Sequence, residues 1–197
     1  ELALDSTGAI TDGVNYRFIA LARSRDGQQQ TTEEERITIA PSVTFEISEQ
    51  TSLNLNLYYQ DDPKMVPSTP LPAKGTLYEA SYCKLDADAY AGDENWAEFA
   101  REVTMIGYKL NHEFSDSISF LQNFRYTNAD ATQQNSYDFG LADADKILTR
   151  TAYKTIEDAE GFVVDNQLAV QFGLAKTNHQ LLFGFEYQTL DSTFDYA

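Results

Sequence analysis

The stretch IAPSVTFEISEQTSLNLNLYYQ, which runs from Ile39 to Gln60, alternates apolar and polar residues on both sides of a short polar turn. The apolar series is Ile39, Pro41, Val43, Phe45 and Ile47 before the turn, then Leu53, Leu55, Leu57 and Tyr59 after it. A period of two is typical of β-strands, because successive side chains point to opposite faces. The stretch therefore predicts an antiparallel hairpin with one apolar face and one face rich in Asn, Ser and Thr. Because proline cannot donate a ladder hydrogen bond, we expect a local bulge or kink at Pro41.

The same alternation recurs along the chain and predicts eight strands in an all-β antiparallel meander. The expected strands are Glu1–Ser6, Val14–Ser24, Arg36–Ile47, Ser52–Asp61, Arg101–Phe114, Ser117–Ala129, Glu160–Leu174 and His179–Leu190. Their connections alternate between short turns, such as Ser6–Gly13, and long loops. The long loops are Arg25–Glu35, Asp62–Ala100 and Thr127–Asp145, the last partly an extension of its two strands. Short turns at one end and long loops at the other are typical of outer-membrane barrels.

Composition excludes several classes of protein. A formal net charge of −17 with 14 Lys and Arg argues against nucleic-acid binding, which needs a clustered basic surface. No stretch approaches the roughly 18 consecutive apolar residues of a transmembrane helix. The first ten residues lack the basic end and apolar core of a signal peptide, so we expect a mature protein or a fragment. Cys83 is the single cysteine and cannot form a disulfide within the chain.

The sequence offers no arrangement typical of catalysis or of a metal centre. The two histidines, His112 and His179, lie far apart, each within a strand pattern, whereas a metal site needs convergent ligands. The acidic segment Leu85–Trp96 lacks the ligand spacing of an EF-hand. We find no nucleophile and base to pair. The chain is therefore expected not to be an enzyme, and to hold no metal ion or cofactor of its own.

Alternation alone fits a membrane barrel, in which the apolar face meets lipid, and a soluble β-sandwich binding module, in which it meets another sheet. Three features favour the barrel. The polar face carries more Asn, Gln, Ser, Thr and Tyr than Lys and Glu, aromatic residues lie toward strand ends, and the strands exceed the roughly five or six residues usual in soluble sheets. A complete small eight-stranded barrel, acting as an adhesin or structural anchor, is a further alternative.

Seven motifs together resemble, in order, the barrel of TonB-dependent siderophore receptors. They are NYRFIALARS, EEERITIAPSVTF, TSLNLNLYYQ, PLPAKGT, GYKLNHEFSDSISFLQNFRY, QQNSYDFG and VDNQLAVQFGLAKTNHQLLFGFEYQ. The likeness covers nearly the whole chain and is closest to the ferrichrome-receptor branch of the family. It implies a bacterial outer-membrane barrel of 22 strands with a plugged lumen. Residues 1–197 would form about eight strands of that wall, with the plug domain and the remaining strands absent.

The resemblance also implies a function and partners. The family takes up ferric siderophores, here expected to be ferrichrome-like hydroxamates whose chelator holds the iron. The TonB complex would act through the absent plug and TonB box, and outer-membrane lipid would surround the apolar face.

The motif NSYDFG resembles a siderophore-contacting stretch of the family, which assigns ligand binding to Tyr137 and Phe139. The aromatic cluster that the family carries just before LP is missing from Asp61–Pro72. The long loop after it contains other aromatic residues, which either replace this cluster or pack the loop against itself. The expected ligand contacts among them are Tyr78, Tyr82 and Trp96, and Tyr90 and Phe99 are further candidates. Aromatic side chains suit a wrapped chelate because they bury apolar ligand surface and their hydroxyls can bond its rim.

Overall fold

The computed structural model describes residues 1–67, 69–82 and 84–197, so Cys83 lies outside the described residues. Eight strands form one sheet: β1 (Leu2–Thr11), β2 (Val14–Asp26), β3 (Glu33–Ser48), β4 (Thr51–Lys64), β5 (Glu98–Ser115), β6 (Ile118–Ala142), β7 (Ile147–Leu174) and β8 (Thr177–Tyr196). Each strand pairs antiparallel with the next in sequence, which confirms the predicted all-β meander. Among the described residues, no helix is long and apolar enough to span a membrane.

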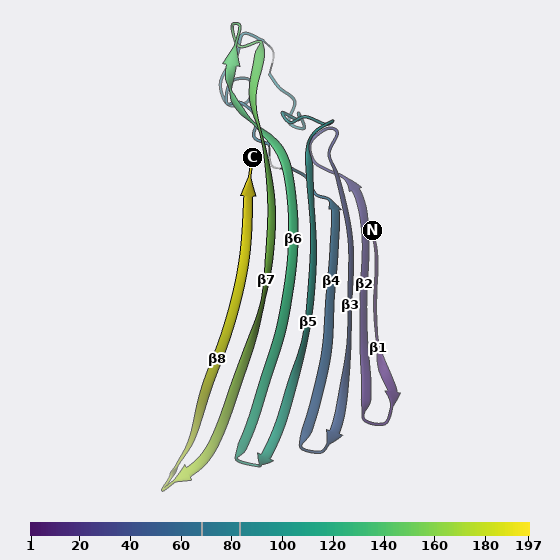
Figure 1. The fold of residues 1–197 in the computed structure, drawn as a ribbon, viewed down its shortest axis with the longest axis vertical. Coiled ribbons are helices and arrows are strands. Elements are labelled where there is room, and N and C mark those ends of the chain that lie inside the picture. The colour runs from purple at the N-terminus through teal and green to yellow at the C-terminus, as the bar shows by residue number, and fades with distance from the viewer. Residues whose placement is uncertain (68, 83) are drawn as a thin grey trace.

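The sheet is a single curved layer with β1 and β8 at its opposite edges (Figure 1). A complete eight-stranded barrel would require β8 to pair with β1, and no such pairing occurs among the described residues. A soluble sandwich would require a second sheet, whereas the described strands all belong to one. The geometry therefore supports a section of a larger barrel and neither of the two alternatives.

The register of the β3–β4 hairpin confirms the predicted sorting of its side chains to two faces. Val43 lies opposite Leu55 on one face, and Ser42 lies opposite Asn56 on the other. The predicted bulge at Pro41 is wrong, because the β3–β4 register is continuous past it. The register changes instead between Ile37 and Glu35, where β4 carries one extra residue beside its own proline, Pro63.

The chain has almost no apolar core of its own. Among the described residues, Ala91 is the single buried residue with an aliphatic or aromatic side chain, proline apart; the other buried residues are two prolines, two glycines and seven polar or charged residues. Large side chains of the apolar face stay exposed, including Ile106 at 52% and Phe185 at 69%. An exposed apolar surface of this extent marks a face that meets another apolar medium, as the wall of a membrane barrel does.

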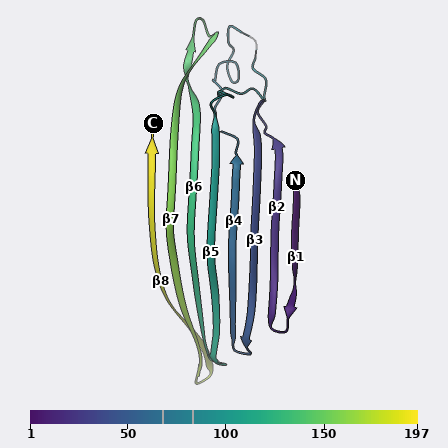
Figure 2. The same cartoon turned by 45° about the vertical axis from the view of Figure 1, so that its right-hand side comes forward.

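The connections alternate as predicted, with tight turns at one end and long loops at the other (Figure 2). The predicted strands are too short at several ends, and two connections show this most clearly. The turn expected at Ser6–Gly13 shrinks to residues 12–13, because β1 continues to Thr11. The strand extension expected within Thr127–Asp145 is confirmed and is longer than expected, so β6 and β7 form a long hairpin that is closed by residues 143–146. These extensions lie beyond the apolar belt and carry no apolar alternation. They still form strands, because strand pairing needs only backbone groups.

Candidate functional site

The β4–β5 loop, residues 65–97, covers the loop end of the sheet and is tied to two other connections and to β6. The Gln30 amide of the β2–β3 loop donates to the carbonyl of Asp88 at 2.7 Å. The hydroxyl of Thr69 donates to Oδ1 of Asn135 on β6 at 2.9 Å, and both side chains are buried. Lys74 Nζ lies 2.8 Å from an oxygen of Asp145 at the tip of the β6–β7 hairpin. These contacts place the loop across β3 to β7.

A buried carboxylate organises the strand ends from which this loop departs. The side chain of Asp62, fully buried near the end of β4, accepts hydrogen bonds from three donors on three strands. The donors are Arg36 Nε at 2.5 Å, Arg101 Nη2 at 2.8 Å and Gln60 Nε2 at 2.6 Å. Charge-assisted bonds of this kind are about twice as strong as neutral ones. The network therefore fixes the spacing of β3, β4 and β5 below the loop.

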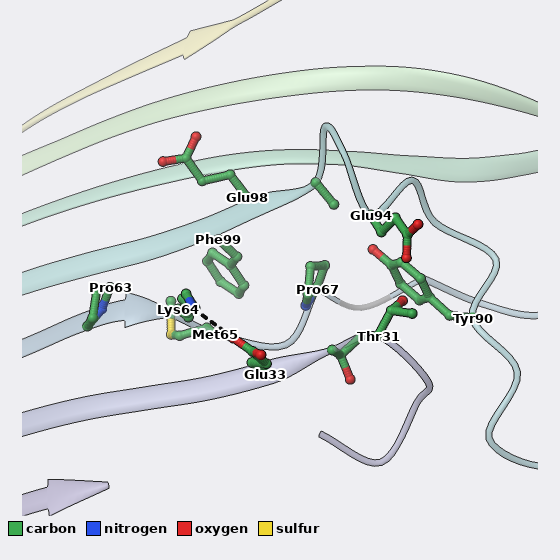
Figure 3. Close-up of a pocket in the computed structure, with 12 residues that line it drawn as sticks. Thr31, Glu33, Pro63, Lys64, Met65, Pro67, Tyr90, Glu94, Glu98 and Phe99 are labelled. Carbon is green, nitrogen blue, oxygen red and sulfur yellow. Dashed lines mark hydrogen bonds and ion pairs between the residues drawn. The ribbon is translucent and has the colours of Figure 1, made fainter. Parts of the chain in front are cut away.

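A pocket of about 360 Å³ opens where these strands meet the loop (Figure 3). Its apolar walls come from the β4 end, the loop and the start of β5; they are Pro63, Met65, Pro67, Tyr90 and Phe99. A volume of this size is within the range of small-molecule sites. The site can therefore bury an apolar group of a ligand.

Charged groups at the same pocket are predominantly acidic. Glu33, Glu94 and Glu98 line it together with one cation, Lys64. Lys64 Nζ lies 2.7 Å from an oxygen of Glu33 and 3.2 Å from one of Glu35, so two carboxylates already neutralise it. Glu94 also lines the pocket, and it takes no part in that ion pair.

The phenol of Tyr90 stays neutral in this pocket. Burial raises the pKa of Tyr90 above its usual value, because an ionised phenolate loses its hydration there. The ring therefore offers a neutral aromatic face and a hydroxyl, and adds no negative charge of its own near neutral pH.

A second aromatic feature, a ladder of Tyr137, Tyr153 and Tyr196, crosses the loop ends of β6, β7 and β8. The ring centroids of Tyr137 and Tyr153 are 5.9 Å apart, and those of Tyr153 and Tyr196 are 6.1 Å apart with the planes at 11°. Asn123 of β6 lies opposite Asp165 of β7 on the polar face of the sheet. Tyr137 lies 14 residues further along β6, an even spacing, so the ladder lies on the same face. In a barrel this face lines the lumen.

The five predicted ligand contacts do not converge on one point. Tyr137 joins the tyrosine ladder, whereas Phe139 lies beyond it at 76% exposure, next to a register shift of β6. Tyr78 and Tyr82 are brought together in a second cavity of about 320 Å³ near the middle of the β4–β5 loop. Trp96 lies near the start of β5 and is 37% exposed.

Two tyrosines of the ladder, Tyr153 and Tyr196, were missed from the sequence. Residues 145–159 were not assigned to a strand, so no register placed Tyr153 beside Tyr137. The further candidates Tyr90 and Phe99 do share one site, the pocket of Figure 3. Among the described residues, no group of three or more His, Cys, Asp or Glu side chains is arranged to hold a metal ion.

Comparison with known proteins agrees with this architecture. A family profile described as "TonB dependent receptor-like, beta-barrel" matches residues 36–197. The ferrioxamine receptor of Yersinia enterocolitica is 32% identical over 188 residues, which is 94% of this chain and 26% of that protein. The ferrichrome outer membrane transporter and phage receptor of Escherichia coli K12 is 32% identical over 198 residues, which is 91% of this chain and 26% of that protein.

Solved structures show the same fold at lower identity. The siderophore receptor PiuA of Acinetobacter baumannii superposes with a TM-score of 0.82 at 21% identity, covering 98% of this chain and 28% of that one. The open form of the ferric-catecholate import receptor Fiu of E. coli K12 gives 0.85 at 18% identity, covering 96% and 32%. The chain thus spans about a quarter of the length of the curated relatives it matches. It belongs to the TonB-dependent receptor family, and it forms an eight-stranded section of the outer-membrane β-barrel of such a receptor.

Proposed function

We propose that this chain is the part of a ferric-siderophore uptake receptor that supplies barrel wall, lumen lining and extracellular binding loops. The receptor would bind the chelate outside, and the TonB complex would drive its passage by acting on a plug segment. Lipid would surround the apolar face, and iron would stay with its chelator. No covalent chemistry is assigned to the chain.

The observation that carries the proposal is the tyrosine ladder on the polar face, at the end that bears the long loops. Three neighbouring rings from three strands, one pair stacked at 11° and the other tilted at 44°, form an aromatic surface of low conformational entropy. Such a surface suits a compact chelate that presents apolar ligand backbone around an enclosed iron. The names of the two relatives, both receptors or transporters of hydroxamate chelates, support the same class of ligand.

The contact residues are proposed on this basis. We assign Tyr137 and Phe139 on β6 to the ligand, and Tyr78, Tyr82 and Trp96 of the β4–β5 loop to closure over it. Phe139 and Tyr78 are among the most exposed aromatic side chains, at 76% and 69%, so they are free to pack against a ligand.

The test is fluorescence quenching of the full-length receptor by a panel of ferric siderophores, repeated with Tyr137→Ala and Phe139→Ala. We expect tight binding of a hydroxamate chelate, weakened about tenfold or more by each change, since aromatic anchors carry much of a binding energy. Phe114→Ala is the matched control, because Phe114 is 62% exposed at the opposite, short-turn end. Binding of a chelate that both variants leave unchanged would remove these residues from the site, and failure to bind any ferric chelate would refute the function.

A further inference from the structure

We propose that Lys109 of β5 and Arg125 of β6, the lumen cation pair, bind carboxylate side chains of a receptor segment that lies in the lumen, outside residues 1–197. The inference goes beyond siderophore uptake, because it concerns what covers the inner wall of the barrel, whichever ligand the receptor carries. It depends on the barrel and on the charges of its polar face.

Both cations lie on the polar face, at the height of the apolar belt. Lys109 lies opposite Asn123, and Arg125 follows Asn123 by two residues on β6, so all three share one face. The preceding residues, Tyr108 and Phe124, belong to the apolar face, where their rings stack with centroids 5.5 Å apart. In the barrel, lipid would cover that side at this height. The lumen cation pair is therefore open to the lumen alone.

Five other arginines on the polar face are matched by acids of the wall itself. Their guanidinium nitrogens lie 2.5 to 3.0 Å from carboxylate oxygens. These arginines are Arg17, Arg23, Arg25, Arg36 and Arg101. Lys109 and Arg125 are exposed and have no acidic partner among residues 1–67, 69–82 and 84–197. Acids are not scarce, since the chain has 31 Asp and Glu against 14 Lys and Arg.

The strands beside the lumen cation pair offer it no acid directly across the ladder. The residues opposite are Asn54 and Asn123 for Lys109, and Gly107 and Val163 for Arg125. β5 and β6 are interior strands of the sheet (Figure 1), so strands that complete the barrel would pair with β1 and β8 only. A partner from the rest of the barrel wall therefore cannot lie next to these two residues.

Two acids share a hollow of about 420 Å³ with the lumen cation pair, and neither forms an ion pair with it among the described residues. Asp165 of β7 instead accepts hydrogen bonds from Asn123 Nδ2 at 3.2 Å and Gln167 Nε2 at 2.7 Å. Glu186 lies opposite Asp165 on the edge strand β8, where a following strand can reach it. The hollow is thus open to a carboxylate from the lumen side.

Charge and chain length together identify the occupant. The matched part is 26% of each of two relatives, so most of each relative lies outside it. A segment packed against this wall removes water from the lumen cation pair, and an enclosed cation without a partner is costly. The segment must therefore present Asp or Glu here. Arg125 can bind one carboxylate through two parallel hydrogen bonds, whereas Lys109 acts as a compact point charge.

The test is coupling of the full-length receptor with a water-soluble carbodiimide, which joins a lysine amine to a touching carboxylate as an amide, with water transferred to the reagent. We expect Lys109 to be joined to an Asp or Glu outside this section of the wall. Arg125→Lys should add a second link to the same segment. Lys176, in the β7–β8 turn, is the internal control and should form no such link. Coupling of Lys109 to Asp165 or Glu186, or to no carboxylate, would overturn the proposal.

Hydrogen exchange provides a second readout on the segment that coupling identifies. We expect the combined change Lys109→Gln and Arg125→Gln to speed exchange of that segment about five- to tenfold, as the loss of two partly exposed ion pairs allows. Lys176→Gln should leave it unchanged. Equal exchange in all three proteins would overturn the inference.

Two controls separate this occupant from others and from the uptake function. Saturation-transfer NMR compares butanoate with butyramide; a preference for butanoate that the combined change abolishes would show a site open to free carboxylates and would overturn the segment as occupant. Ferric-chelate binding is measured on the same samples. A receptor that binds no chelate but shows the coupling supports this inference while refuting siderophore uptake.

Discussion

The buried carboxylate of Asp62 provides the sharpest test of how this sheet is held together. Asp62→Asn keeps the shape of the side chain but removes the charge that binds Arg36 and Arg101. The amide also replaces one acceptor oxygen with a donor, which then faces a guanidinium. The wild-type side chain is 1% exposed, so water cannot replace the lost interactions without local rearrangement.

The size of the effect follows from the exposure of the partners. A hydrogen bond to a charged group contributes about 1.5–3 kcal/mol, and removal of one partner of a fully buried ion pair costs about 3–5 kcal/mol. The side chains of Arg36 and Arg101 are 29% and 40% exposed, so solvent recovers part of that cost. We therefore expect Asp62→Asn to lower the free energy of unfolding by about 2–3 kcal/mol.

The assay is urea unfolding of the full-length receptor in lipid vesicles, combined with limited proteolysis of residues 65–97. We expect a lower unfolding midpoint and faster cleavage of the loop, because the network fixes the strand ends below it. The matched control is Asp61→Asn, which removes the same charge one residue earlier on the opposite face. Equal effects of the two substitutions would refute the assigned role of the network.

Two further substitutions test the close approach of strands and the anchoring of the loop. Gly161→Ala would place a Cβ 2.3 Å from the backbone oxygen of Thr189 on β8, so we expect a loss of about 1–3 kcal/mol in urea unfolding. Gly184→Ala, with its nearest atom 3.9 Å away, should be neutral, and equal losses would contradict the packing argument. Lys74→Ala removes the ion pair with Asp145, and we expect at most about 1 kcal/mol in stability but faster proteolysis of the β4–β5 loop. Unchanged cleavage would show that other contacts hold the loop.

The sequence predicts the sheet well wherever one face is apolar. Val43 and Leu55 alternate with polar neighbours, and a one-residue error of register would put both on the wrong face. The hairpin therefore has one consistent solution, which the structure shows. The same reasoning fails for Thr127–Ala142, where alternation of apolar and polar residues disappears while the backbone ladder continues to Ala142. Composition alone cannot separate such a polar strand from a loop.

The candidate site was less predictable for a related reason. Tyr137 was identified through a motif, but its neighbour Tyr153 comes from the partner strand, and their contact depends on the length of the β6–β7 hairpin. The pocket around Tyr90 and Phe99 depends on how the β4–β5 loop returns to the sheet. That path is determined by side-chain contacts such as Thr69 to Asn135, which no local pattern reveals.

Two tyrosine–glutamate contacts bear on the lengths of β6 and β7, one between β4 and β5 and one between β6 and β7. On the apolar face, the hydroxyl of Tyr59 donates to Glu102 at 3.0 Å and that of Tyr126 donates to Glu160 at 2.9 Å. A carboxylate in hydrocarbon would be costly, so in the proposed membrane barrel the lipid tails would end at the height of these pairs. A strand needs only about 9–11 residues to cross a bilayer, whereas β6 has 25 and β7 has 28. The excess lies beyond the tyrosines and carries the ladder and the contacts of the β4–β5 loop, at the end where the proposed receptor would meet its ligand.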